Sequence, residues 1–185
     1  MKKCLSALLL SALALAPCSY ATDFFLNVEG GRSSNDLNFK YREDGTGESV
    51  YSNLITVGAG LSLQSKIVLG IGLTSSFSDN FLGAFDSYKV AQQQLYVGYR
   101  INVNKHIRIT PQIGYTHWKL TSEESIWFND EKKSATKFSG EDAYGQINLE
   151  FPVSKLVTVV ASFSRTYYAF GSTDAAQAGV IFTFN

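Results

Sequence analysis

The sequence predicts an all-β protein, an eight-stranded antiparallel up-and-down transmembrane β-barrel, on three observations. Segments of about ten residues alternate apolar and polar side chains, which is the length that a tilted strand needs to cross a bilayer. Three short turns with a shared polar-lysine pattern join such segments in pairs. After residue 21 no apolar stretch approaches the length of a membrane-spanning helix, and only helices and closed barrels span lipid. If the mature chain is in a membrane, it is therefore a barrel.

The beginning of the chain has the layout of a secretory signal peptide. Met1-Lys2-Lys3 precedes an apolar run from Leu5 to Ala16, and Ser19-Tyr20-Ala21 has small residues at its first and third positions. We expect cleavage after Ala21, so that residues 1–21 are the signal and residues 22–185 are the barrel domain. No sign of a second domain or of an internal repeat follows.

Cys18 offers an alternative to this cleavage site. The segment Leu15-Ala16-Pro17-Cys18 resembles a lipoprotein signal, but Pro17 stands where that motif has a small residue. Cleavage after Ala21 removes both cysteines and leaves 164 residues without a disulfide. Loss of Lys2 and Lys3 from 16 basic residues leaves 14 against 16 acidic ones, so the charge does not indicate nucleic acid as a partner.

Three turns join six of the predicted strands into hairpins: Leu63-Gln64-Ser65-Lys66-Ile67, Asn102-Val103-Asn104-Lys105-His106 and Pro152-Val153-Ser154-Lys155-Leu156. Every second residue on either side of each turn is apolar, which is the pattern of a strand with two different environments. These apolar positions are Ile55, Val57, Ala59, Leu61, Ile67, Leu69, Ile71 and Leu73, then Leu95, Val97, Tyr99, Ile101, Ile107, Ile109 and Ile113, then Ile147, Leu149, Phe151, Val157, Val159, Ala161 and Phe163.

The two ends of the mature chain supply the first and the last strand. Phe24, Leu26 and Val28 alternate with polar residues, as do Ala176, Ala178, Val180, Phe182 and Phe184. Longer polar connections are expected at about 34–48, 78–87 and 121–141, with a shorter one at 169–173. Short turns at one end and long loops at the other are typical of the periplasmic and extracellular ends of outer-membrane barrels. Pro111, in mid-strand, predicts a local irregularity or bulge.

Four charged residues fall on the polar face of these strands: Glu29, Arg100, Arg108 and Glu150. Polar and charged residues there indicate a hydrated or ion-paired interior, whereas a soluble barrel of the lipocalin kind would turn its apolar face inward. An eight-stranded interior is just wide enough to be filled by side chains. We expect Glu150 to pair with Arg108 or Arg100 and the cluster to close the barrel, with a narrow gated pore as the alternative.

The signal peptide and four strand segments, Phe25-Leu26-Asn27-Val28-Glu29-Gly30-Gly31, Val57-Gly58-Ala59-Gly60, Ile109-Thr110-Pro111-Gln112-Ile113-Gly114-Tyr115 and Ala178-Gly179-Val180-Ile181-Phe182-Thr183-Phe184, resemble small outer-membrane barrels related to the OmpA membrane domain, OmpX and Ail. The resemblance implies a monomer in the outer membrane of a Gram-negative bacterium. It implies adhesion, host-factor binding or envelope integrity without enzymatic activity, metal or cofactor. Outer-membrane lipid, lipopolysaccharide, the barrel assembly machinery and a host or extracellular ligand are the implied partners.

The family's C-terminal aromatic assembly signal is represented by Phe182 and Phe184, although Asn185 follows them. Aromatic and basic residues also mark the predicted outer loops as a candidate binding surface: Phe39, Tyr41, Arg42, Phe81, Phe85, Trp127 and Phe128. The alternative is that these aromatics pack among the loops or extend an interfacial girdle. Lys132, Lys133 and Lys137 are candidates to contact lipopolysaccharide phosphates.

Lipid A modification is the enzymatic alternative, because deacylases and palmitoyltransferases exist on this fold. His117 lies close to the outer end of its strand, but the His-x-Ser pattern of the deacylases is absent, since Trp118 and Lys119 follow it. A base at His117 with Ser162 or Ser164 as nucleophile requires a bulge that turns the histidine inward. We therefore expect no catalytic residues.

Overall fold

A computed structural model describes residues 23–37, 50–63, 66–77, 87–123, 135–168 and 171–184. Its strands are β1 (Asp23–Leu37), β2 (Val50–Ser62), β3 (Ile67–Phe77), β4 (Ser87–Tyr99), β5 (Ile101–Asn102), β6 (Arg108–Glu123), β7 (Ala135–Pro152), β8 (Val157–Tyr168) and β9 (Gly171–Phe184). Within these residues there is no helix of the length and hydropathy that crossing a bilayer demands.

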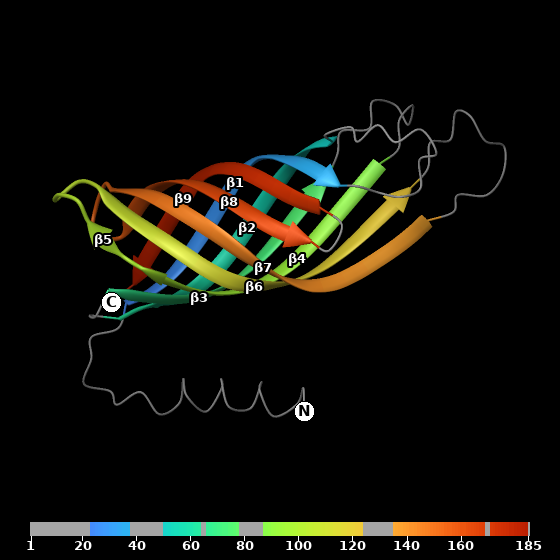
Figure 1. The fold of residues 1–185 in the computed structure, drawn as a ribbon. Coiled ribbons are helices and arrows are strands. Elements are labelled where there is room, and N and C mark those ends of the chain that lie inside the picture. The colour runs from blue at the N-terminus through green and yellow to red at the C-terminus, as the bar shows by residue number, and fades with distance from the viewer. Residues whose placement is uncertain are drawn as a thin grey trace, which may run out of the picture.

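The strands form one closed antiparallel barrel (Figure 1). Strands that follow one another in the chain are paired, except β4 and β5; β1 also pairs with β9, and β4 pairs with β6. The two-residue strand β5 continues β4 beyond Arg100, so that the nine assigned strands make an eight-stranded barrel. The predicted fold class is confirmed.

Pro111 explains the interruption between β4 and β5. The ladder pairs Gly98 with Gln112 on one side and Ile101 with Ile109 on the other, in one continuous register that sets Tyr99 opposite Pro111. Proline has no N–H to donate to the ladder, so this pair loses a hydrogen bond. The predicted irregularity is present, but a bulge is wrong, because no residue is inserted in either strand.

The stagger of the strands sets their tilt and the width of the barrel. The row of ladder partners that begins at Phe25 returns to β1 at Asn35, ten residues further along, through Gly60, Gly70, Tyr96, Gly114, Tyr144, Thr166 and Thr173. With the usual rise per residue and strand spacing, this stagger gives a tilt of about 40° and a backbone radius of about 8 Å. Side chains pointing inward can fill such an interior.

Burial alternates along the strands as the period-two pattern predicts. The outward side chains are apolar and exposed, among them Ile71 (60%), Leu73 (62%) and Ile113 (69%). The inward side chains are buried although many are polar, and Glu29 and Glu150 are each 2% exposed. An apolar exterior around a polar interior is the arrangement of a barrel whose surroundings are lipid.

The apolar exterior stops at one level on all strands. The first outward polar residue towards the long connections is Arg32, Asn53, Ser75, Gln93, His117, Glu141, Arg165 or Asp174, one for each strand of the barrel. We call this set the polar rim. The short turns lie at the opposite end, the turn end, at the left of Figure 1. Segments 38–49, 78–86, 124–134 and 169–170 connect the strands at the loop end.

The strands continue beyond the polar rim into segments predicted as loops. β6 runs to Glu123 and β7 begins at Ala135, whereas residues 121–141 were expected to form one connection. Ladder pairing continues to Glu123 and Ala135, and a packed cluster of Val90, Trp118, Leu120, Phe138 and Tyr168 fills the barrel near this level. Polarity marked the end of the lipid face, but backbone pairing and interior packing determine the end of a strand.

Two of the short turns owe their form to the polar residue that precedes the lysine. The Asn104 side chain accepts hydrogen bonds from the backbone N–H of His106 and Ile107, at 2.8 and 2.9 Å. Ser154 accepts in the same way from Leu156 and Val157. In the first turn of the chain, between β2 and β3, the backbone of Lys66 has a positive φ of 68°, a conformation typical of tight turns. These side chains hold the turn backbone by local hydrogen bonds.

Candidate functional site

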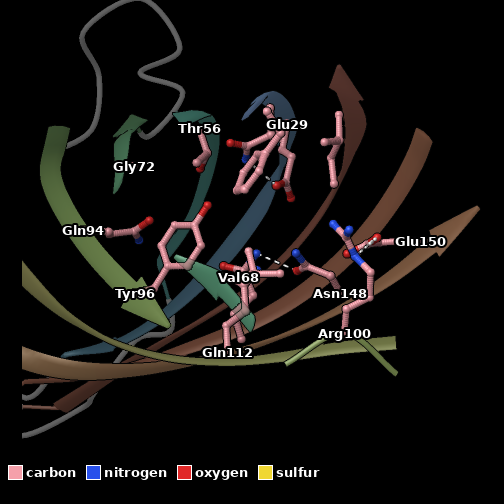
Figure 2. A pocket seen from close by; sticks show the side chains of 14 residues that line it. Glu29, Thr56, Val68, Gly72, Gln94, Tyr96, Arg100, Gln112, Asn148 and Glu150 are labelled. Atoms are coloured by element: carbon pink, nitrogen blue, oxygen red, sulfur yellow. Dashed lines mark hydrogen bonds and ion pairs between the residues drawn. The ribbon is translucent and has the colours of Figure 1, made fainter. Parts of the chain in front are cut away.

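The charged centre of the barrel is an ion pair between Arg100 and Glu150. Arg100 Nε lies 3.3 Å from Glu150 Oε2, and Thr110 donates a hydrogen bond of 2.6 Å to Glu150 Oε1. Arg100 also donates from Nη1 to Ser62 Oγ at 2.9 Å. These residues line a small cavity in the barrel, and Figure 2 shows Arg100 beside Glu150 with the Tyr96 ring on the other side of it. Burial of an unpaired carboxylate would destabilise the fold. The charged partner and the hydrogen-bond donor of Glu150 offset this cost.

Arg108 lies directly opposite Glu150 in the β6–β7 register. It is partly exposed near the turn end, whereas the Arg100 side chain is 15% exposed and lines the same cavity as Glu150. Arg100, Arg108 and Glu150 therefore lie on the same inward face, as the alternation of side chains predicts. Of the two arginines, Arg100 forms the ion pair with Glu150.

Glu29 occupies a second polar position on the wall of this cavity. Asn27 Nδ2 donates to Glu29 Oε1 at 2.8 Å, and Ser162 Oγ donates to Oε2 at 2.5 Å. Next to this pair, Gln177 Nε2 donates to Thr56 Oγ1 at 2.8 Å, and Thr56 shares a hydrogen bond with Thr74. The Ser162–Glu29 and Gln177–Thr56 bonds each link strands that are not adjacent in the sheet. The network uses the Glu29 carboxylate as an acceptor of structural hydrogen bonds.

Aromatic rings opposite glycines fill much of the remaining interior. Tyr96 pairs with Gly70 and Gly114, Tyr144 also faces Gly114, and Phe25 faces Gly60. A Cβ atom on any of these glycines would overlap the facing ring. Glycine is required at these positions because the ring occupies the space of the missing side chain.

The space left in the barrel is small. One cavity, lined by residues that include Glu29, Tyr96, Arg100 and Glu150, offers about 20 Å³ to the centre of a water molecule. A second cavity of the same size, towards the loop end, is crossed by a hydrogen bond of 2.7 Å from Gln92 to Tyr168. Each has room for about one water molecule. This geometry is that of a closed barrel rather than an open channel.

The comparison with family models agrees with the closed barrel and its lipid-facing exterior. The model of the outer membrane protein beta-barrel domain matches residues 5–184. The chain belongs to this family. It is an outer-membrane β-barrel protein, as the sequence predicted, and the predicted location is confirmed. A search of curated proteins found no match.

Solved structures of outer-membrane proteins share this fold at low sequence identity. Neisserial surface protein A has a TM-score of 0.62 at 12% identity, over 87% of this chain and 97% of that one. Ail, the attachment invasion locus protein of Yersinia pestis, has 0.58 at 10%, over 88% and 97%. The N-terminal β-barrel domain of Pseudomonas aeruginosa OprF has 0.56 at 15%, over 86% and 97%. A second structure of Ail, at 11% identity, contains the heparin analogue sucrose octasulfate.

His117 belongs to the polar rim of this outer-membrane barrel. Its Nδ1 lies 3.8 Å from Glu141 Oε1, and Tyr115 donates a hydrogen bond of 2.5 Å to Glu141 Oε2. Ser162 is buried on the inward face, where it bonds to Glu29. Strand parity is unbroken along β6, so His117 and Ser162 lie on opposite faces of the barrel wall. The pairing of His117 with an inward serine, considered from the sequence, is not formed.

Phe182 and Phe184 lie on the outward face of β9 near the turn end and are 39% and 46% exposed. The ring of Phe184 packs against Phe24, with centroids 6.1 Å apart. The seven candidate loop residues Phe39, Tyr41, Arg42, Phe81, Phe85, Trp127 and Phe128 lie outside the described residues.

Sequence reasoning placed the four charged residues on the inward face and offered Arg108 or Arg100 as the partner of Glu150, but it did not identify their uncharged hydrogen-bond partners. Asn27, Ser62, Thr110 and Ser162 were visible as polar members of the same face. Their pairing depends on the stagger of the barrel, since Ser62 and Ser162 reach Arg100 and Glu29 across an intervening strand. The alternation along a strand predicts which face a side chain is on, but it does not predict how far along the barrel axis that side chain lies.

Proposed function

We propose that this protein is a non-enzymatic outer-membrane barrel that acts through its extracellular loops, in adhesion, in host-factor binding or in maintaining the envelope. The observation that carries the proposal is the closed interior. Its cavities each hold about one water molecule, and the Glu29 and Glu150 carboxylates are engaged by neighbouring side chains. Cavities of this size leave little room for a substrate beside the two carboxylates.

The loop end supports a role at the cell surface. β6 and β7, of 16 and 18 residues, project furthest beyond the polar rim (Figure 1). In outer-membrane barrels the long connections are extracellular, so these strands would raise the 124–134 connection above the membrane. A rigid barrel that carries variable connections is a common scaffold for binding.

The names of similar structures suggest which ligands to test first. One is called a surface protein and another an attachment invasion locus protein, and the latter has been solved with a sulfated heparin analogue. We therefore place sulfated polysaccharides and host-cell surfaces first among the ligands of the proposed binding loops.

The proposal is tested by displaying the full-length protein on a non-adherent Gram-negative host. Adhesion to cultured cells and to immobilised heparin is compared with variants in which residues 38–49, 78–86 or 124–134 are replaced by a short Gly-Ser linker. We expect at least one replacement to abolish adhesion while the protein still shows heat-modifiable migration, the mark of a folded barrel. A triple Lys66→Gln, Lys105→Gln, Lys155→Gln variant at the turn end is the control.

Adhesion that survives all three replacements would contradict loop-mediated binding. Envelope integrity has a separate readout, the detergent sensitivity of cells with and without the protein. Equal sensitivity and no adhesion at any stage would overturn the proposal as a whole.

A narrow pore is the second candidate, favoured by the Arg100–Glu150 pair on the wall of the cavity at the turn-end half of the barrel. Single-channel recording on the pure protein tests it. The closed interior leads us to expect no conductance, and a reproducible unitary current altered by Glu150→Gln would favour the pore instead. Lipid A spectra from cells with and without the protein test the enzymatic alternative, and we expect them to be identical.

A further inference from the structure

Glu29 is a buried carboxylate that has no cationic partner among the described residues. Its side chain points inward from β1, and the residue is 2% exposed. The ion pair of the interior joins Arg100 to Glu150, and no lysine, arginine or histidine in the described strands and turns lies within ion-pair distance of Glu29. A buried charge without a counter-charge is strongly unfavourable, most of all at membrane depth. A positive charge beside Glu29 would therefore stabilise the fold.

The inward charges leave one negative charge unbalanced in the cavity of Figure 2. The wall of this cavity carries two carboxylates, Glu29 and Glu150, but one guanidinium, that of Arg100. The other charged side chains that the described strands turn inward lie at the two ends of the barrel: Asp23 and Arg108 at the turn end, and Asp142 at the level of the polar rim. Because Arg100 is paired with Glu150, the unbalanced charge in the cavity is that of Glu29.

The two hydrogen bonds of Glu29 are compatible with a bound cation. Asn27 Nδ2 donates to Oε1 at 2.8 Å and Ser162 Oγ donates to Oε2 at 2.5 Å, so both carboxylate oxygens are acceptors. A proton on either oxygen would face the hydrogen of a donor, whereas a cation can share the remaining lone pairs and leave both bonds in place. The hydrogen-bond pattern therefore favours a cation over a proton as the balancing charge.

Asn27 adds an oxygen atom that has no hydrogen-bond partner among the described residues. The Asn27 residue is 7% exposed and lines the same cavity as Glu29. Its Nδ2 is used by Glu29, but its Oδ1 is buried without a donor and lies in the space that a side chain at Gly58 would fill. Gly58 is on the inward face of β2, two residues from Thr56. Asn27 Oδ1 therefore points into the interior, beside a carboxylate that lacks a counter-charge.

The size and the lining of the cavity fit one small cation. The cavity has room for about one particle of the size of water, since it offers about 20 Å³ to the centre of such a particle. Its wall contains carboxylate, amide and hydroxyl oxygens, among them those of Glu29, Thr56, Gln94 and Asn148 (Figure 2). Oxygen ligands of these kinds suit hard cations, whereas softer metals prefer nitrogen and sulfur. One unbalanced negative charge matches the charge of a monovalent ion.

We propose that the cavity beside Glu29 and Asn27 is a binding site for one monovalent metal cation, Na⁺ or K⁺. Glu29 and Asn27 Oδ1 supply ligands, and other polar groups of the wall complete the coordination. The ion balances the charge of Glu29 and thereby stabilises the closed barrel. It is a counter-ion within the scaffold, and its binding is independent of the adhesion proposed for the loops.

The site is tested by urea unfolding of the full-length protein, folded in detergent, at a series of Na⁺ or K⁺ concentrations. Choline chloride keeps the ionic strength constant, because choline is too large for a cavity of about 20 Å³. An ion that binds only the folded state raises the folding equilibrium constant by up to about tenfold for each tenfold rise in its concentration. We expect the wild type to show this dependence on at least one of the two metal ions, and the comparison of Na⁺ with K⁺ identifies the preferred one.

Glu29→Gln is the test variant, since it removes the charge and keeps the size of the side chain. We expect it to lose the dependence on the metal ion. Glu141→Gln removes a carboxylate from the polar rim instead and is the matched control, which should keep the wild-type dependence. Asn27→Ala, which removes the second proposed ligand, should weaken the dependence.

Equal stability of the wild type in Na⁺, K⁺ and choline would overturn the proposal, and this comparison needs no variant if Glu29→Gln does not fold. A dependence that persists in Glu29→Gln would overturn it as well, because the ion would then bind elsewhere. An infrared band of a protonated carboxylic acid that is present in the wild type and absent from Glu29→Gln would show that a proton balances the charge in place of a metal ion.

Discussion

Arg108 stands opposite Glu150 in the β6–β7 ladder, yet the guanidinium within 3.3 Å of the Glu150 carboxylate belongs to Arg100. The ladder register and the ion pair therefore select different arginines. Arg100 lines the same cavity as Glu150 and also donates a hydrogen bond to Ser62. This arrangement ties the end of β4 to β2 and β7 through the interior.

The ion pair predicts unequal effects of the two arginines on stability. Arg100→Met should lower the free energy of unfolding by about 3 kcal/mol, because it leaves the buried Glu150 carboxylate without a cation. Arg108→Met, the control, should cost clearly less because Arg108 is partly exposed. Urea unfolding followed by tryptophan fluorescence measures both. An Arg100→Met, Glu150→Leu double variant should regain most of the loss, and a larger effect of Arg108 would refute the assignment.

The rings opposite glycines predict steric coupling between strands. Gly70→Ala should destabilise the barrel by about 1–3 kcal/mol, because the new methyl group overlaps the Tyr96 ring. Gly145→Ala is the matched control, since a Cβ there has its nearest neighbour 4.0 Å away. Adding Tyr96→Leu to Gly70→Ala should cost less than the sum of the two single changes in urea unfolding. Strict additivity would show that the ring is not the obstacle.

Phe184 is predicted to be the aromatic residue of the assembly signal. Phe184→Ala should reduce the amount of folded protein in outer-membrane fractions, measured by heat-modifiable migration. Phe24→Ala removes the other ring of the same contact and is the control for packing alone. Both variants should refold similarly from urea into detergent. An unchanged amount of Phe184→Ala in the outer membrane would show that the signal lies elsewhere.

The mature protein is predicted to begin at residue 22, because small residues precede a cleavage site after Ala21. Intact-mass measurement of protein purified from outer membranes should give the mass of residues 22–185. Radiolabelled palmitate should not be incorporated. A mature chain that begins at a lipid-modified Cys18 would contradict this prediction, and Cys18→Ser would then abolish the labelling.

The sequence by itself determined which face of each strand meets lipid. Because side chains alternate with period two, the apolar positions around the three lysine turns assigned Glu29, Arg100, Arg108 and Glu150 to the interior. Glu29 and Glu150 are buried there, and Arg100 and Arg108 are half-buried. The position of Pro111 in the middle of a predicted strand also predicted where the backbone hydrogen bonding of the sheet is interrupted. These features depend on local alternation and local backbone chemistry.

The tertiary structure decided which residues meet. The choice of Arg100 for Glu150 and the position of Tyr96 over Gly70 both depend on the stagger between strands. That stagger is a property of the closed barrel, in which every register must agree after one full circuit. The alternation within a single strand does not depend on this closure. The position of each side chain along the barrel axis, and so its partners, could therefore be known only from the folded barrel.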